Sequence, residues 1–355
     1  MRVGILTSGG DCQALNATMR GLALTLYRNV KDVEIIGFID GYKGLMYEKY
    51  KKMKPKDFYD ILNVGGSILG NSRCPFKRMR IIENGFDKVK AMKNTYKKLE
   101  LDCLVVLGGN GSIKSANMLS QEGLNVIALP KTIDNDAWGT DYTFGYSSAT
   151  AIVTRYLDEI KTTAASHSRV FVIEVMGHKV GHICLSAGIA AGADVILLPE
   201  IPYDIKVVAK KVKETLKNEK NYAIIACAEG AISEADALMK RKDYKAKVLA
   251  RNGRSVAYEV ADELSQEIDA EIRVSCIGHA QRGGNPNSYD REISTRFGVE
   301  GARLIIKKHY GEYVVLQGNH VTHIPLEATA GKLKYVDTEG EIVQSAKLVG
   351  ISFGE

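Results

Sequence analysis

The chain has 355 residues, which is long for one ordinary hydrophobic core and suits two domains. With 45% hydrophobic residues, 25% charged residues and a formal net charge of +6, it has the composition of a globular protein, and it contains no apolar segment of membrane-spanning length. The lysines of residues 206–220 are spaced like the outer face of an amphipathic helix without interleaved aromatic residues, so neither a nucleic acid nor a membrane is expected as a partner.

Six cysteines are spread along the chain without a C-x-x-C pair, which argues against a zinc site and against a disulfide framework. A reducing cytoplasm is therefore the expected location, and no signal peptide is expected before the first strand. Cys103, Cys227 and Cys276 lie in apolar runs and are expected in the core. Cys12 lies in a glycine-marked loop and is expected to be unreactive.

Short apolar runs alternate with amphipathic stretches along the whole chain, which is typical of parallel strands covered by helices on both faces. The predicted fold class is therefore α/β. A long helical pattern over residues 147–163 predicts a domain boundary near residue 145. The predicted strands, in chain order, are residues 3–6, 34–39, 101–107, 126–129, 170–175, 193–198, 222–228 and 272–277.

Two of these strands run into glycine-containing turns that precede helical patterns. The first strand leads into residues 7–11, and the strand at residues 101–107 leads into residues 108–112. Such a turn offers backbone N–H groups and the positive end of a helix to a phosphate. Glycine is also the ordinary residue of any tight turn, so each loop alone is weak evidence.

Asp134 and Asp136 lie in the segment of residues 130–136, which directly follows the strand at residues 126–129. In extended backbone, side chains two residues apart point the same way, so this pair can combine a proton acceptor with a group that steers metal or water. A polar turn is the alternative, because Asp and Asn also favour turns. Since parallel strands end at one edge of their sheet, the two glycine turns and the carboxylate loop are expected together at a ligand-binding edge.

Arginine, histidine and carboxylate residues in glycine or apolar contexts mark the second half of the chain. They are Arg169, residues 176–178, Glu229, Arg273 and residues 278–284. Arginine forks bind phosphate bidentately, and a carboxylate beside them can hold sugar hydroxyls. For any one of these arginines, a structural ion pair is the alternative.

With these motifs in place, the chain resembles the phosphofructokinase family nearly end to end, most specifically at Thr-Ile-Asp-Asn-Asp (132–136) and Gly-His-Ala-Gln-Arg-Gly-Gly (278–284). The resemblance implies two Rossmann-like three-layer α/β domains with mainly parallel sheets. Residues 1–145 and 281–330 would bind the phosphoryl donor, and residues 146–280 and 331–355 the sugar phosphate. It also implies phosphoryl transfer from ATP to the 1-hydroxyl of fructose 6-phosphate with Mg²⁺ as cofactor, in a homo-oligomer that is typically a tetramer.

The same resemblance assigns roles to single residues. Asp134 is implied as the catalytic base, Thr132 as a residue that holds the transferring phosphoryl group, and Asp136 as support for the metal and charge arrangement. Sugar-phosphate binding is implied for Thr132, Asp134, Arg169, Met176, Gly177, His178, Glu229, Arg273, His279 and Arg282, with Arg169 and Arg273 reaching in from a neighbouring subunit. Donor binding is implied for Gly9, Tyr42, Arg73, Cys74, Gly109, Asn110, Gly111, Ser112 and Lys131.

Four positions bear on where this chain departs from the family pattern. Gly111 is typical of members that use ATP and Lys131 of members that use pyrophosphate, so ATP is the expected donor and pyrophosphate the alternative. Asn110 replaces the usual aspartate, so weak magnesium binding by the protein is expected, with Asp136 as a further candidate ligand. His178 replaces an arginine, which makes the charge near the reacting phosphates depend on pH.

An alternative from another functional class is a non-catalytic regulatory subunit that binds sugar phosphate. Asn110 and His178 favour it, whereas the intact Thr132, Asp134 and Asp136 argue against it, because a binding-only protein needs no base beside an acceptor hydroxyl. A dinucleotide-binding oxidoreductase is disfavoured, since no G-x-G-x-x-G follows the first strand.

Overall fold

In the computed structural model, which describes residues 1–218, 220–329 and 331–355, the chain forms two compact units. The first comprises Met1–Ser148 and Arg282–Lys334, and the second comprises Ala149–Gln281 and Tyr335–Glu355. The crossings expected from the sequence lay near residues 145, 281 and 330. Residue 330 is outside the described residues, and the last crossing falls between Lys334 and Tyr335. The binding roles predicted for the two parts stay predictions.

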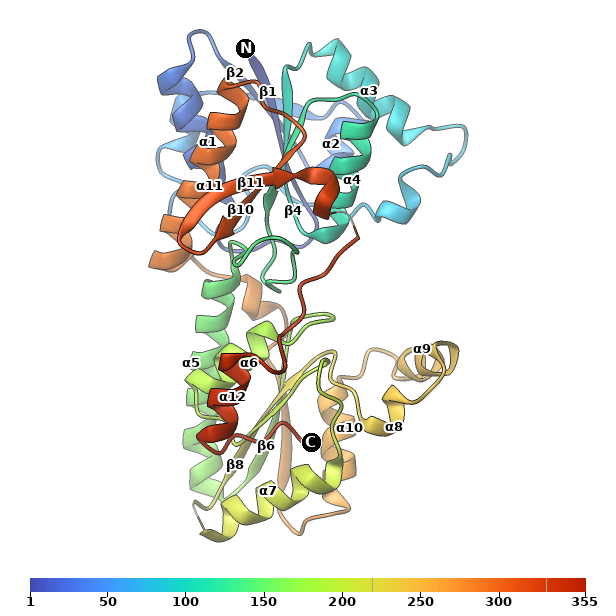
Figure 1. Cartoon of the computed structure of the whole chain (residues 1–355), viewed down its shortest axis with the longest axis vertical. Coiled ribbons are helices and arrows are strands. Elements are labelled where there is room, and N and C mark those ends of the chain that lie inside the picture. Colours follow the sequence, from blue (N-terminus) through green and yellow to red (C-terminus); the bar gives the residue numbers. More distant parts are fainter. Residues whose placement is uncertain (219, 330) are drawn as a thin grey trace. The chain divides into compact units, whose positions relative to one another are not determined.

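The first unit contains a seven-stranded sheet (Figure 1). Its strands are β1 (Arg2–Ser8), β2 (Glu34–Phe38), β3 (Tyr50–Met53), β4 (Cys103–Gly108), β5 (Val126–Pro130), β10 (Glu312–Gln317) and β11 (His320–Pro325). They lie in the order β11-β10-β5-β4-β1-β2-β3, and only the two outer strands, β3 and β11, run antiparallel to their neighbours. The inner strands are almost wholly buried, as expected when helices cover both faces.

Helices cover the two faces of this sheet as separate groups (Figure 1). On one side lie α1 (Leu15–Asn29) and α11 (Ser288–Ile306), and on the other α2 (Tyr42–Met46), α3 (Lys88–Lys98) and α4 (Asn110–Gln121). The pair α1 and α11 approach closely, because a Cβ added at Gly298 would lie 2.3 Å from the Thr18 carbonyl oxygen. The short 3₁₀ turns of this unit are η1 (Pro55–Phe58), η2 (Phe76–Arg78) and η4 (Leu326–Thr329).

The second unit contains a four-stranded, all-parallel sheet in the order β7-β8-β6-β9. Its strands are β6 (Val170–Val175), β7 (Val195–Leu197), β8 (Ala223–Ala228) and β9 (Ile272–Cys276). Its helices are α5 (Tyr146–His167), which begins in the first unit, α6 (His182–Ala190), α7 (Ile205–Asn218), α8 (Glu234–Ala237), α9 (Arg241–Ala250), α10 (Val256–Ser265) and α12 (Glu341–Leu348). The 3₁₀ turn η3 (Gly278–Arg282) follows β9.

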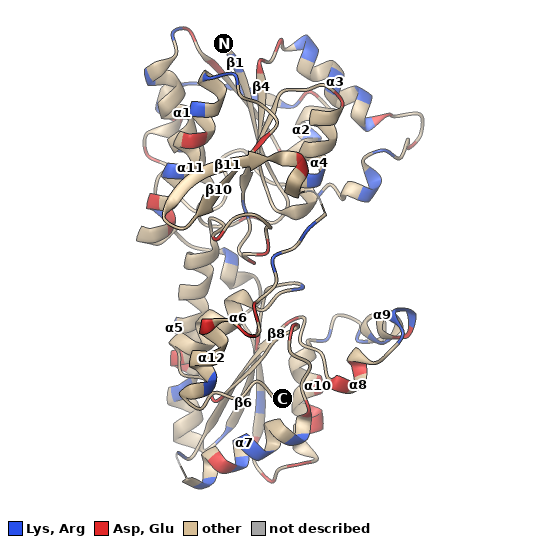
Figure 2. Cartoon of the chain, viewed as in Figure 1, with Lys and Arg blue, Asp and Glu red and all other residues tan. Residues whose placement is uncertain are grey.

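The core of the second unit lies between its sheet and the helices α7 and α10. Val208 and Val212 of α7 and Val260 of α10 are buried in this cluster. The helix α6 packs against the opposite face, since a Cβ at Gly188 would lie 2.7 Å from the side chain of Ile196. The lysines of α7 lie along its outer side (Figure 2), so the amphipathic helix expected there is confirmed.

The α/β class and each of the eight predicted strands are confirmed, and the helix predicted at residues 147–163 is α5. Cys103 and Cys227 are buried as expected, whereas Cys276 is exposed because β9 is an edge strand with a largely open side. Cys12 is also buried, and burial raises the pKa of its thiol to about 12, which leaves it protonated and unreactive at neutral pH. None of the helices in the described parts of the chain has the length and apolarity that a membrane span requires.

Candidate active site

Three strands of the first unit, β1, β4 and β5, end at the same level of the sheet. Ser8 of β1 lies opposite Gly108 of β4, and Gly108 lies opposite Pro130 of β5. The loops that follow these strands therefore share one edge of the sheet, as the sequence predicted. Two contacts join them: the Ser112 hydroxyl donates to Ser8 Oγ over 2.9 Å, and a Cβ at Gly109 would lie 3.3 Å from the Lys131 carbonyl oxygen.

The glycine turns leave backbone exposed at this edge. Gly9 has φ of +87°, a conformation that side chains disfavour, and a Cβ at Gly10 would lie 2.8 Å from Arg282 Nη1. The helix α4 starts at Asn110 without a side-chain cap, so its first N–H groups and its positive dipole end face the same edge. A Cβ at Gly111 would meet nothing within 4 Å, which identifies open space beside this helix start.

Lys131 reaches beneath the first glycine turn. Its side chain is buried, and Nζ donates to the Gly10 carbonyl oxygen. Burial, and to a smaller extent the nearby Arg282, lowers the pKa of this ammonium, while the carboxylates of Asp134 and Asp11 act in the opposite direction. The ammonium therefore lies away from the open space beside Gly111 and within a cluster of two cations and two carboxylates.

Arg282 belongs to the first unit and lies against the same turn. Its Nη1 donates to the Asp11 carbonyl oxygen over 3.0 Å. Its Nε–H is buried and has no hydrogen-bond partner within the described parts of the chain. A buried guanidinium N–H without an acceptor is costly, so this position fits a group that approaches an anion.

The carboxylate loop after β5 is not extended, so the predicted alternation of Asp134 and Asp136 is wrong. Asn135, between them, has φ of +53°, and its Oδ1 accepts the N–H of Thr143 over 3.1 Å. The Asp134 N–H donates to Thr132 Oγ1 over 3.1 Å. The loop is therefore a tight turn in which Asp134 is half-buried and Asp136 is buried.

Asn110 holds Asp136. Its Nδ2 donates to the Asp136 carboxylate over 2.7 Å and to the Asp136 backbone carbonyl over 3.3 Å. No group of three or more His, Cys, Asp or Glu side chains within residues 1–218, 220–329 and 331–355 could hold a metal ion. The oxygens of Asn110 and Asp136 fit a magnesium ion only as an addition to ligands that a phosphate would bring.

The remaining predicted donor residues fall into two groups. Tyr42 is fully buried and its hydroxyl donates to the Ser112 carbonyl oxygen over 2.8 Å, so it supports the helix start from behind. Arg73 and Cys74 instead line an open pocket of about 220 Å³ together with Tyr47. This pocket, which has both polar and apolar lining residues, lies outside the glycine turns.

In the second unit, several predicted residues lie at the carboxyl edge of the sheet, where Val175 of β6 is opposite Ala228 of β8. The Glu229 carboxylate Oε1 accepts the N–H groups of Gly177 and His178 over 3.2 and 2.5 Å. The Met176 N–H donates to Gln281 Oε1 over 3.0 Å. Met176, Gly177, His178 and Glu229 are thus brought together, and His279 follows in the turn after β9.

Arg169 and Arg273 lie at the other end of this sheet. Arg169 precedes β6, and Arg273 is opposite Phe171 near the start of the same strand. Both arginines pair with Glu271, Arg169 over 2.7 Å. Because the six residues of β6 separate Arg169 from Met176, the two ends are about 20 Å apart. Within one chain, these arginines do not join the groups at the carboxyl edge.

Comparison with known proteins identifies the family. The family model described as Phosphofructokinase matches residues 2–305. The chain belongs to the phosphofructokinase family. A relative from Spirochaeta thermophila, named ATP-dependent 6-phosphofructokinase, is 46% identical over 99% of this chain and 97% of its own length. A second, from Bacteroides thetaiotaomicron and named ATP-dependent 6-phosphofructokinase 3, is 42% identical over 100% of both chains.

A solved structure of phosphofructokinase from Saccharomyces cerevisiae is also similar. It matches with a TM-score of 0.80 and 28% identity, over 93% of this chain and 45% of that chain. The fold expected from the phosphofructokinase resemblance is therefore confirmed.

Two supporting residues of this phosphofructokinase fold were not predicted as site residues. Asp290, buried in the first turn of α11, accepts hydrogen bonds from Tyr142 Oη, Gly145 N and Ser148 N at 2.7, 2.9 and 2.8 Å. Gln281 holds the Met176 loop, as described above. Gln281 lies within the motif of residues 278–284, whereas Asp290 lies outside the motifs named above, and only the structure shows that each of them positions a loop.

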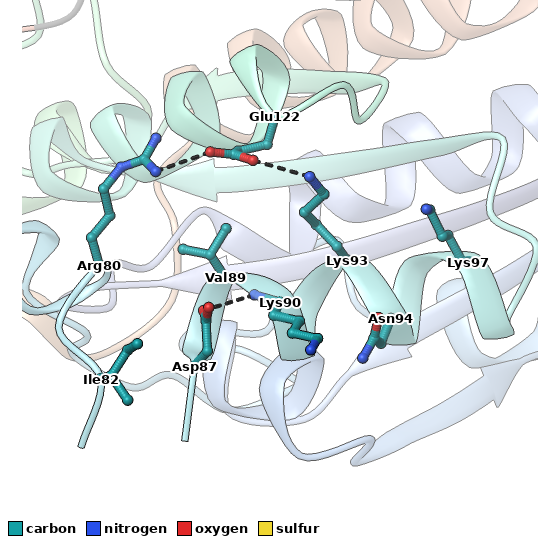
Figure 3. Close-up of a pocket in the computed structure, with 9 residues that line it drawn as sticks. All are labelled: Arg80, Ile82, Asp87, Val89, Lys90, Lys93, Asn94, Lys97 and Glu122. Atoms are coloured by element: carbon teal, nitrogen blue, oxygen red, sulfur yellow. Dashed lines mark hydrogen bonds and ion pairs between the residues drawn. The ribbon is translucent and has the colours of Figure 1, made fainter. Parts of the chain in front are cut away.

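A further pocket of about 310 Å³ lies beside α3 and contains none of the predicted site residues (Figure 3). Glu122 reaches between Arg80 and Lys93, with O···N distances of 2.9 and 3.0 Å, as the dashed lines in Figure 3 show. Both carboxylate oxygens of Glu122 are engaged, but four cations and only two carboxylates line the pocket, which leaves it with a formal net charge of +2.

The Asn110–Asp136 contact predicts a metal-dependent stability. Asn110→Asp places two carboxylates about 2.7 Å apart, so we expect the thermal midpoint in EDTA to fall by about 2–6 °C. Saturating Mg²⁺ should restore it, because the pair then binds a divalent cation. The measurement is thermal unfolding with and without Mg²⁺, with Asn94→Asp on the exposed side of α3 as the charge control. A midpoint that Mg²⁺ does not move would contradict this assignment.

Proposed function

We propose that the protein is an ATP-dependent 6-phosphofructokinase, which transfers the γ-phosphoryl group of ATP to the 1-hydroxyl of fructose 6-phosphate. The observation that carries this proposal is the meeting of two glycine turns, the buried Lys131, the half-buried Arg282 and the Asp134 loop at one sheet edge. Phosphoryl transfer needs positioning and charge neutralisation more than covalent help, and this edge offers both. The full-length relatives that carry the same name support it.

In this proposal Asp134 is the base that accepts the proton of the 1-hydroxyl as its oxygen bonds to phosphorus and ADP leaves. Thr132 holds the loop through its hydroxyl, which accepts the Asp134 N–H, and Asp136 completes the charge arrangement. Lys131, Arg282 and the start of α4 offset the negative charge of the phosphates. A bound Mg²⁺ would supply further neutralisation of the donor phosphates, with Asn110 and Asp136 as its protein neighbours.

Two observations favour ATP over pyrophosphate. The space beside Gly111 is open, and the Lys131 ammonium is bonded to Gly10 instead of entering that space. A nucleotide needs room beyond its terminal phosphates, whereas pyrophosphate does not. The pocket lined by Tyr47, Arg73 and Cys74 supports the same choice.

We further propose that the sugar-phosphate site is shared between subunits of a homo-oligomer, typically a tetramer, in the cytoplasm. Met176, His178 and Glu229 lie at one edge of their sheet, whereas Arg169 and Arg273 lie at the other. A second copy can bring its arginines to the first copy's site. Glu271 would keep both arginines ordered until the phosphate of fructose 6-phosphate arrives.

The central test is the rate of fructose 1,6-bisphosphate formation with ATP and Mg²⁺. Asp134→Ser should lower kcat by roughly 10²–10⁴-fold and retain fructose 6-phosphate binding, because only the base is lost. Asp60→Ser, an exposed site, is the control. Fructose 6-phosphate binding by wild-type protein without any turnover would instead identify a regulatory subunit.

Donor choice is tested at Gly111. Gly111→Asp should lower kcat/KM for ATP by about tenfold or more, because a carboxylate fills the open space and repels the nucleotide phosphates. Gly111→Ala should remain near wild type, since its methyl group meets nothing within 4 Å. The measurement compares initial rates with ATP and with pyrophosphate. Wild-type preference for pyrophosphate would reverse the donor assignment.

The shared site predicts recovery of activity by mixing inactive variants. Arg273→Ala and Asp134→Ser should each be nearly inactive alone, whereas co-expression in equal amounts should restore about a quarter of wild-type activity. With equal amounts of the two chains, about half of the subunit pairs are mixed. In a mixed pair, one of the two sites combines an intact Asp134 with an intact Arg273, which gives about a quarter of all sites. No recovery in verified mixed oligomers would place both residues in the same chain's site.

A further inference from the structure

The last segment of the first unit lies along the carboxylate loop. Leu333 forms a bridge with Ala137, and the Lys334 N–H donates to the Asp136 carbonyl oxygen over 2.9 Å. Lys332 Nζ lies 4.1 Å from the centre of the Trp138 ring. Residues 332–334 therefore follow the loop residue by residue, although almost 200 positions separate them in the sequence.

The Lys334 side chain closes the turn that follows Asp136. Its Nζ donates to the carbonyl oxygens of Thr140 and Asp141, both over 2.9 Å. Burial lowers the pKa of this ammonium to about 8, and the carboxylates of Asp141 and Asp136 act in the opposite direction. A half-buried cation that bonds two carbonyl groups of one turn fixes the shape of that turn.

Asp136 is consequently held from two sides. The Asn110 side chain at the start of α4 binds the Asp136 carboxylate, and the backbone N–H of Lys334 binds the Asp136 backbone carbonyl. The same turn is tied to the sheet, because the Asp141 N–H donates to the Leu316 carbonyl oxygen of β10 over 2.8 Å. Lys334 thus completes a frame around the residues that follow Asp134.

We propose that Lys334 is a positioning residue for phosphoryl transfer, which holds the turn of residues 136–141 and through it the Asp136 carboxylate and the Asp134 base. This rests on the proposed function of the Asp134 loop. The Lys334 side chain acts through the backbone carbonyls of Thr140 and Asp141. Its loss should therefore affect the rate of the bound complex more than substrate binding.

The test compares Lys334→Met with Lys334→Arg and with Lys332→Met, whose lysine lies on the same segment. Lys334→Met should lower kcat roughly 10–100-fold with the KM for fructose 6-phosphate within about twofold, since small misplacements of catalytic groups cost this much. Lys334→Arg should recover most of the rate, because a guanidinium can donate to both carbonyls. Lys332→Met should keep the wild-type kcat.

Hydrogen exchange of the backbone amides at residues 137–142 is the second measurement. Faster exchange there in Lys334→Met, but not in Lys332→Met, supports the proposal. Wild-type kcat in Lys334→Met, or unchanged exchange, overturns it. If Lys334→Met does not fold, Lys334→Gln, which keeps an amide NH₂ group but loses the positive charge, should show intermediate kcat and exchange. A wild-type protein that does not phosphorylate fructose 6-phosphate defeats the proposed function, while the exchange comparison still decides whether Lys334 holds the turn.

Discussion

The site depends on the common level at which β1, β4 and β5 end. Their side chains are buried on both faces of the sheet, and a slip of one residue would move each side chain to the opposite face, where it would meet the other layer of helices. The hydrophobic core therefore sets the common level of the three loops. Contacts between the loops, such as Ser112 with Ser8 and Asn110 with Asp136, then join them. Polar residues at this edge can vary, as Asn110 and Lys131 do relative to the family pattern, without disturbing the sheet that positions them.

Like charges at the edge are separated by amides and backbone groups. An aspartate at position 110 would oppose Asp136 at hydrogen-bond distance, whereas the amide of Asn110 donates to it and needs no cation between the two. The price is a weaker oxygen set for Mg²⁺. Lys131 is stabilised similarly, since the Gly10 carbonyl accepts its N–H and the carboxylates of Asp134 and Asp11 favour its charged form against burial.

Sequence patterns found eight strands, including the edge strands β7 and β9, and missed three: the outer strands β3 and β11 and the largely buried β10. Short apolar runs between glycines marked eight strands, but β3, with three exposed residues of four, and β11, with none buried, lack that signal. The turn at Asn135 was considered only as the alternative to an extended pair of aspartates, because the contact with Thr143 that accompanies its positive φ is not visible in the local sequence. Lys334 belongs to no sequence motif. It contacts the carboxylate loop only because the chain returns to the first unit at Arg282, so its position could not be predicted from the local sequence.

The first unit is discontinuous in sequence, and this has a consequence for its biosynthesis. Residues 282–334 supply α11, which packs on α1, and β10, which pairs with β5. While the intervening part of the chain is translated, a delay on the order of ten seconds, β5 remains an open sheet edge and Gly21 of α1 faces no partner helix. Unpaired strand edges invite association with other chains. The nascent chain is thus most exposed to aggregation shortly before the ribosome supplies the helix and strand that complete the catalytic edge.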